Sequence, residues 1–187
     1  MQQGQMRTAG WVCIASAVTT LPLTVLGVIA MLSEHSPEAR AASVALSFVS
    51  LLLFVYIFHS FRRLLTEQFN FTRVNTHISI LIALNAVMVA VSVLAAIVPV
   101  LNILSTVVAI IALLALGAVY IVLGVKLMEL HEQFGGLLKP FCYLTIATGV
   151  CFVGVCLLPL GLLTSIVQDV LLALIFFRVA ERADVTA

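Results

Sequence analysis

Four long stretches of this chain contain no Asp, Glu, Lys or Arg, and the charged residues lie in short clusters between them. The charge-free stretches cover residues 8–33, 41–61, 74–125 and 140–168. A helix in water needs a charged or polar outer face, whereas an ionised side chain at the centre of a bilayer costs roughly 2.5–3.5 kcal/mol or more. The pattern therefore predicts a membrane protein that crosses the bilayer several times.

The lengths of these stretches predict six helical spans, because about 20 apolar residues cross a hydrocarbon core of about 30 Å. Stretch 74–125 is long enough for two crossings, with a turn at Pro99 and Asn102. We expect Pro159 and Gly161 to break the last stretch in the same way. The predicted spans are about 9–32, 41–60, 77–97, 101–126, 140–158 and 162–180.

The first apolar run follows Arg7 and is too long for the apolar region of a signal peptide, so we interpret it as a retained span. With six spans, both termini lie on one side of the membrane. Eight basic residues fall on that side, against Arg40 alone on the other. The positive-inside rule then predicts that both termini are cytoplasmic. The eight are Arg7, Arg62, Arg63, Arg73, Lys126, Lys139, Arg178 and Arg182.

Short sequence echoes suggest that the chain, a single membrane domain over residues 1–187, contains three helical hairpins: 7–69, 73–134 and 138–187. The tripeptide Val-Tyr-Ile at 55–57 returns at 119–121, and Glu-Gln-Phe at 67–69 returns at 132–134. Convergent composition of membrane helices could produce such echoes. A shared polar tripeptide favours duplication instead, and the repeats would then be parallel rather than inverted.

This order of short hairpins, with a cytoplasmic segment followed by Phe or Lys at the next helix start, resembles uncharacterised prokaryotic families of six-span membrane proteins. The resemblance covers the whole chain at the level of architecture. It implies a six-span all-α bundle in a prokaryotic inner membrane and implies no activity.

Composition narrows the class of function. Of the 187 residues, 63% are hydrophobic and 9% are charged, and the net charge is +1, so nothing points to a nucleic-acid partner. The sequence has no metalloprotease, nucleophile-elbow or Walker motif, so we expect neither an enzyme nor a cofactor. The four cysteines lie in apolar stretches and are interpreted as small buried hydrophobes: Cys13, Cys142, Cys151 and Cys156.

Asp169 is the exception to the charge pattern. It lies nine residues before Arg178, which places it about 13.5 Å along a helix from that boundary residue, near the bilayer centre. With Gln168 beside it and Asn85 in the third span, it could belong to a proton or cation pathway. The alternative is structural, with the Asp169 carboxyl bonded to Asn85 or Thr148. Three histidines near helix ends, at 59, 77 and 131, lack metal-ligand spacing, so no metal is predicted.

Small residues at helical spacing predict close packing, because lipid provides no hydrophobic drive between helices. Such stripes occur in the first, third and fifth spans. The stripe in the first span comprises Ala9, Cys13, Ser16, Thr20, Thr24 and Gly27, and the stripe in the third comprises Ser79, Ala83, Ala86 and Ala90. Aromatic residues concentrate at the cytoplasmic boundary, where we expect an interfacial belt. Leu64, Leu65, Leu127 and Leu130 are expected against the lipid headgroups.

Two functions fit these observations. The first is a non-enzymatic scaffold or accessory subunit of an inner-membrane assembly, in contact with lipid and with other membrane helices as a homo-oligomer or beside a partner subunit. The second is a small proton- or cation-coupled transporter or channel that uses Asp169. Little polar lining and short loops favour the first.

Overall fold

The computed structural model describes residues 3–32, 37–97, 102–130, 136–154 and 157–185, and these residues form an all-helical bundle. Pro99, Cys156 and the repeated tripeptide at 132–134 lie outside them, so the duplication stays a prediction. Six α-helices are present in the described residues. They are α1 (Gln3–Leu32), α2 (Pro37–Phe69), α3 (Asn75–Ile97), α4 (Asn102–Met128), α5 (Leu138–Val153) and α6 (Leu158–Val185).

Each predicted span overlaps one helix, but several helix bounds differ from the predicted ones, and two differences matter most. α2 continues beyond residue 60 to Phe69, so its last turns extend the bundle past the predicted span. Pro159 does not end the fifth span as expected. α5 ends at Val153 with Gly154 as its C-cap, and Pro159 lies in the first turn of α6, where a missing backbone N–H removes no helical hydrogen bond.

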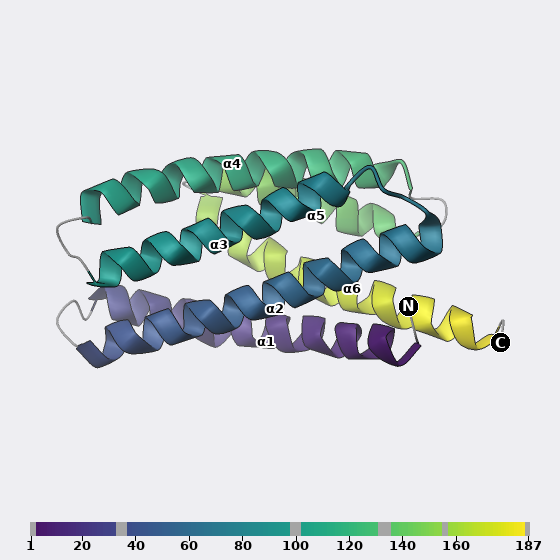
Figure 1. Ribbon diagram of the computed structural model, residues 1–187, viewed down its shortest axis with the longest axis horizontal. Helices are drawn as coiled ribbons and strands as arrows, with labels where there is room; N and C mark the ends of the chain where they lie inside the picture. The colour runs from purple at the N-terminus through teal and green to yellow at the C-terminus, as the bar shows by residue number, and fades with distance from the viewer. Residues whose placement is uncertain (1–2, 33–36, 98–101, 131–135, 155–156, 186–187) are drawn as a thin grey trace.

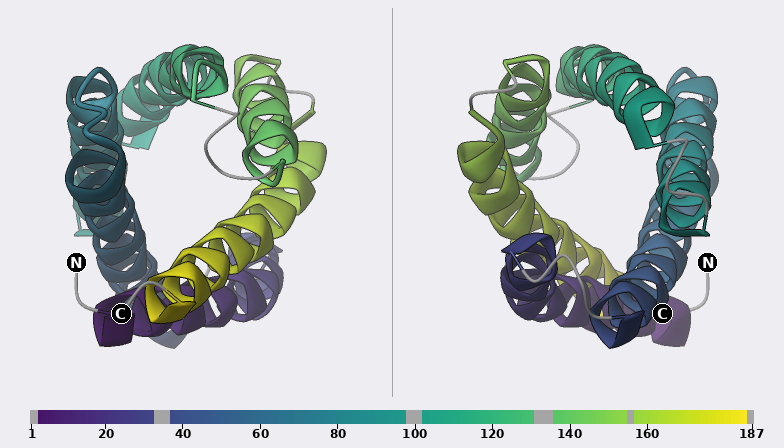
Figure 2. Two further views of the ribbon diagram at one scale, coloured as in Figure 1. Left: turned by 90° about the vertical axis from the view of Figure 1, so that its right-hand side faces the viewer. Right: turned by 90° about the vertical axis from the view of Figure 1, so that its left-hand side faces the viewer.

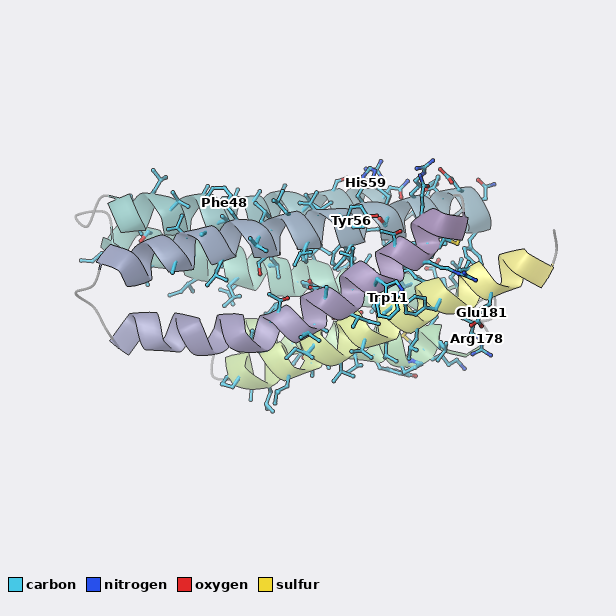
Figure 3. All side chains as sticks on the ribbon, turned by 90° about the horizontal axis from the view of Figure 1, so that it is seen from below. Trp11, Phe48, Tyr56, His59, Arg178 and Glu181 are labelled. Carbon is cyan, nitrogen blue, oxygen red and sulfur yellow. The ribbon has the colours of Figure 1, made fainter. Side chains whose placement is uncertain are left out.

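The six helices form a closed ring, which the end-on views in Figure 2 show. In the described residues each helix packs against the helix before it and the helix after it in sequence. α1 also packs against α6, and this contact closes the ring. α1 begins and α6 ends at the same end of the bundle (Figure 1), which is called the terminal end below. Side-chain nitrogen atoms gather at that end, where Arg178 and Glu181 are labelled in Figure 3.

Aromatic side chains fill the ring interior near the terminal end. Ring centroids of Phe61 and Phe141 are 5.7 Å apart, those of Phe61 and Phe176 are 6.5 Å apart, and those of Phe58 and Tyr120 are 6.4 Å apart. These contacts join helices that are not neighbours in the ring, such as α2 and α4. We call this buried group the aromatic plug: Phe58, Phe61, Tyr120, Phe141 and Phe176.

The aromatic belt expected at the membrane boundary is therefore only partly right. Trp11 and Tyr143 are 65% and 58% exposed, as a belt requires, whereas the plug residues are buried inside the ring. The expectation that the boundary leucines face lipid headgroups is wrong, because these side chains belong to the buried core: Leu64, Leu65, Leu127 and Leu130. A ring needs large side chains in its interior, and these residues point inward.

Glycines bring α4 and α5 into close contact. A Cβ atom added at Gly149 would lie 2.6 Å from the carbonyl oxygen of Gly117, and one added at Gly117 would lie 2.7 Å from the carbonyl oxygen of Gly149. Gly124, two turns further along α4, lies against Cys142 and Ile146 of α5 in the same way. Backbone atoms cannot move aside, so these positions require glycine. The close approach is the small-residue packing that membrane helices use.

Burial is uneven along the ring. The described residues of α2 over 44–56, α3 over 82–95 and α4 over 103–111 include no buried side chain. Buried residues concentrate instead in the half of the bundle nearer the terminal end. Cys13, Cys142 and Cys151 are buried free thiols, as expected from their apolar surroundings.

Four helices of the described residues are long and apolar enough to cross a membrane. They are Val44–Glu67, Asn75–Ala95, Ile103–Met128 and Pro159–Glu181, and α5 is a shorter apolar helix. A helical bundle with several such helices is compatible with an integral membrane protein that contacts the lipid bilayer.

Substitution of Gly149 by Ala is expected to destabilise the bundle, because the added methyl group meets the backbone of α4. The expected loss in free energy of unfolding is about 1–3 kcal/mol, typical of overpacking. Gly4→Ala is the matched control, since nothing lies within 4 Å of a Cβ there. Thermal unfolding in mild detergent measures both variants, and equal midpoints for Gly149→Ala and the wild type would contradict the close α4–α5 contact.

Candidate functional site

Asp169 lies in the middle of α6 and accepts a hydrogen bond from α1. The hydroxyl Oγ of Ser16 donates to Oδ2 of Asp169 at 2.9 Å. The two residues are 153 positions apart in sequence, and the packing of α1 on α6 brings them together. This polar contact therefore belongs to the ring closure itself.

The carboxyl group of Asp169 is close enough to interact electrostatically with Cys13 of α1 and with Tyr120 of α4. The backbone of α4 approaches α3 and α5, not α6, in the described residues. The one direct contact of Asp169 in the described residues is with Ser16, so the acid lies at the α1–α6 contact. Asp169 lies seven residues before the plug residue Phe176, so it sits at the edge of the aromatic plug farther from the terminal end.

Gln168 and Asn85, the other predicted site residues, occupy different places. Gln168 is buried beside Asp169 on α6. Asn85 is half-buried on α3, at i+4 and i+7 from the buried Leu81 and Ile78, so it shares their inward face. α3 does not pack against α6 in the described part of the chain, so Asn85 and Asp169 lie on separate walls of the ring.

The expected hydrogen-bond partners of Asp169, Asn85 and Thr148, are wrong, because Asp169 bonds to Ser16. The hydroxyl of Thr148 donates to Oγ1 of Thr164 at 2.9 Å, and that of Thr164 donates to the carbonyl oxygen of Gly161, so this chain of bonds joins α5 to α6 without Asp169. Ser16 takes the expected role. Ser16 belongs to the small and polar stripe predicted in the first span, with Ala9 and Cys13, both of which are buried. The stripe was identifiable from the sequence, but the pairing of Ser16 with Asp169 was not.

The residues that the structure describes contain no group of three or more His, Cys, Asp or Glu side chains placed to hold a metal ion. His59 lies exposed on α2, and His77 lies half-buried on α3. Nδ1 of His77 is a buried nitrogen without a hydrogen-bond partner. His131 lies outside the described residues.

Comparisons with protein-family models, with curated proteins and with solved structures find no match. The class of the protein therefore follows from its own residues. The described residues form an all-helical bundle with membrane-span-like helices, and Asp169 of α6 is bonded to Ser16 across the α1–α6 contact.

Proposed function

We propose that the protein is a non-enzymatic subunit or scaffold of an inner-membrane assembly, and that α3 is the helix that packs against another copy or a partner. The observation that carries this proposal is the exposure of the small-residue stripe on α3. All four members of the stripe are exposed in the bundle: Ser79, Ala83, Ala86 and Ala90.

Two further facts support α3 as the interface. Its apolar window Asn75–Ala95 is 11% buried, compared with 33% for the windows of α4 and α6, so it is the least covered of the four candidate spans. Small side chains let a second helix approach closely, which is where membrane helices gain van der Waals contact and weak Cα–H hydrogen bonds. A lipid-facing helix has no need of a stripe of small residues.

The arrangement of basic residues supports an orientation with the terminal end in the cytoplasm. Basic residues lie near helix ends on that side of the bundle, and the positive-inside rule then favours both termini inside: Arg7, Arg73, Lys126 and Arg178. A prokaryotic inner membrane is part of the proposal through the resemblance to six-span families. The architecture of three hairpins and six crossings belongs to the same proposal, as does the resemblance to uncharacterised six-span families.

Ala86→Leu is expected to dissociate the protein from its second copy or partner subunit, because the larger side chain holds the partner helix away from α3. Native mass spectrometry of protein extracted in mild detergent measures the stoichiometry. We expect the wild type to be an oligomer or a complex and Ala86→Leu to be a monomer. Ala118→Leu, at an exposed alanine of α4, is the matched control and should keep the wild-type stoichiometry. A monomeric wild type would contradict the proposal.

A second candidate, proton- or cation-coupled transport, is favoured by one specific observation. Asp169 lies on α6 next to the buried Gln168, and in the described residues its carboxyl is bonded only to the neutral hydroxyl of Ser16. A carboxyl at membrane depth is a common element of proton and cation pathways. The aromatic plug would then close the pathway toward the terminal end.

Asp169→Asn is expected to preserve the bundle, because an amide oxygen still accepts the hydrogen bond from Ser16, and to abolish proton-linked flux. A pH-sensitive dye inside proteoliposomes measures the flux under an imposed membrane potential. Glu181→Gln, at an exposed acid of the same helix, is the control and should retain the wild-type rate. Full flux in Asp169→Asn would remove Asp169 from any pathway.

A further inference from the structure

A surface pocket lies between α2 and α3 at the terminal end of the bundle. Its volume is about 350 Å³. It occupies the place where the candidate span Val44–Glu67 ends and the candidate span Asn75–Ala95 begins, so a bilayer crossed by both helices would have its surface at this level. We call it the boundary pocket, and its lining residues are His59, Arg62, Arg63, Thr66, Glu67 and Asn75.

The lining residues of α2 are spaced three and four apart, so they form one polar face over the last turns of the helix. Their charges do not balance. Glu67 is the one acid of the lining, and its carboxylate forms an ion pair with Nε of Arg63, four residues earlier. Arg62 is left without a carboxylate partner in the described part of the chain, so the pocket has a net positive charge.

Arg62 is held in place by a neutral group. Its Nη1 donates to Oγ of Ser79 on α3 at 3.2 Å, which leaves other guanidinium N–H groups for an acceptor. Nδ2 of Asn75 donates to Oγ1 of Thr66 at 3.4 Å, and that hydroxyl donates to the carbonyl oxygen of Arg62. The pocket therefore combines one uncompensated guanidinium with amide and imidazole N–H donors, the groups that bind a phosphate.

The same face of α2 continues into the membrane as an exposed apolar track. Leu52 and Tyr56, seven and three residues before His59, are 68% and 41% exposed. Tyr56 and His59 are labelled close together on α2 in Figure 3. A ligand in the pocket thus meets phosphate-binding groups at one end and a hydrophobic strip at the other. A phospholipid has this distribution of charge and apolar surface, whereas free phosphate uses only the polar part.

We propose that the boundary pocket binds the headgroup phosphate of an anionic phospholipid, with Arg62 as the main contact and an acyl chain along Leu52 and Tyr56. Basic pockets between membrane helices bind anionic headgroups for this electrostatic reason. The site does not include Asp169, and it touches the α3 stripe only at Ser79, which accepts the hydrogen bond from Arg62. Lipid binding at Arg62 is measured separately from the stoichiometry of Ala86→Leu, so this proposal and the proposed function can fail independently.

The test compares binding of dioleoyl phosphatidylglycerol, dioleoyl phosphatidylcholine and inorganic phosphate to the full-length protein in a non-ionic detergent, by native mass spectrometry. We expect the wild type to prefer phosphatidylglycerol over phosphatidylcholine, because a choline ammonium group repels Arg62. Arg62→Gln should weaken phosphatidylglycerol binding by roughly tenfold or more, through loss of charge-assisted hydrogen bonds.

Arg73→Gln is the matched control. It removes one positive charge from the same end of the bundle, at an arginine that pairs with Glu129 outside the pocket, and it should bind phosphatidylglycerol as the wild type does. Arg62→Lys retains the charge and should retain part of the binding, which separates loss of the site from a defect in folding.

Three results would overturn the proposal: equal phosphatidylglycerol binding by Arg62→Gln and the wild type, equal binding of the two lipids by the wild type, or equal loss in Arg62→Gln and Arg73→Gln. Binding of inorganic phosphate at Arg62 without any preference between the two lipids would assign the pocket to a soluble phosphate ligand and would overturn the lipid assignment.

Discussion

A ring of six helices has an interior that must be filled, and in this protein large aromatic side chains fill it. The helix backbones approach only their neighbours around the ring, so contact across the centre depends on long side chains. Phe61 shows this directly, because its ring meets Phe141 of α5 and Phe176 of α6 from α2. In lipid, where apolar burial itself gives little drive, such packing contacts hold the bundle together.

The position of the plug divides the ring into two unequal halves. Toward the terminal end the interior is closed by buried aromatic and leucine side chains. Farther from the terminal end, residues 44–56 of α2, 82–95 of α3 and 103–111 of α4 include no buried side chain, and Asp169 lies between the two halves. An acid at that depth needs a partner, and the α1–α6 closure supplies Ser16. Whether the ring acts as a subunit or as a pathway, the same closure fixes the acid in place.

The number of helices in the described residues and their approximate positions could be predicted from the sequence, because the cost of burying charge in lipid limits where each span can run. Their ends could not, since a helix can continue past the apolar stretch, as α2 does to Phe69. The inward faces could not. A helix that is apolar all round gives no periodic signal, so Phe61 and Trp11 look alike in sequence although one is buried and the other exposed. Asp169 was identifiable as an exception to the charge pattern. Ser16 was visible as a polar member of a first-span stripe, but its pairing with Asp169 was not predictable, because ring closure joins the first helix to the last.

Thiol cross-linking in isolated membranes tests the closed ring most directly. Trp11 and Phe177 have ring centroids 5.8 Å apart across the α1–α6 contact, and Ile80 lies exposed on α3, which does not pack against α1. In a chain whose native cysteines are replaced by alanine, a Trp11→Cys, Phe177→Cys pair should cross-link efficiently and a Trp11→Cys, Ile80→Cys pair should not. Recovery of the chain in the soluble fraction, or equal cross-linking of the two pairs, would contradict a membrane-embedded ring closed by its first and last helices.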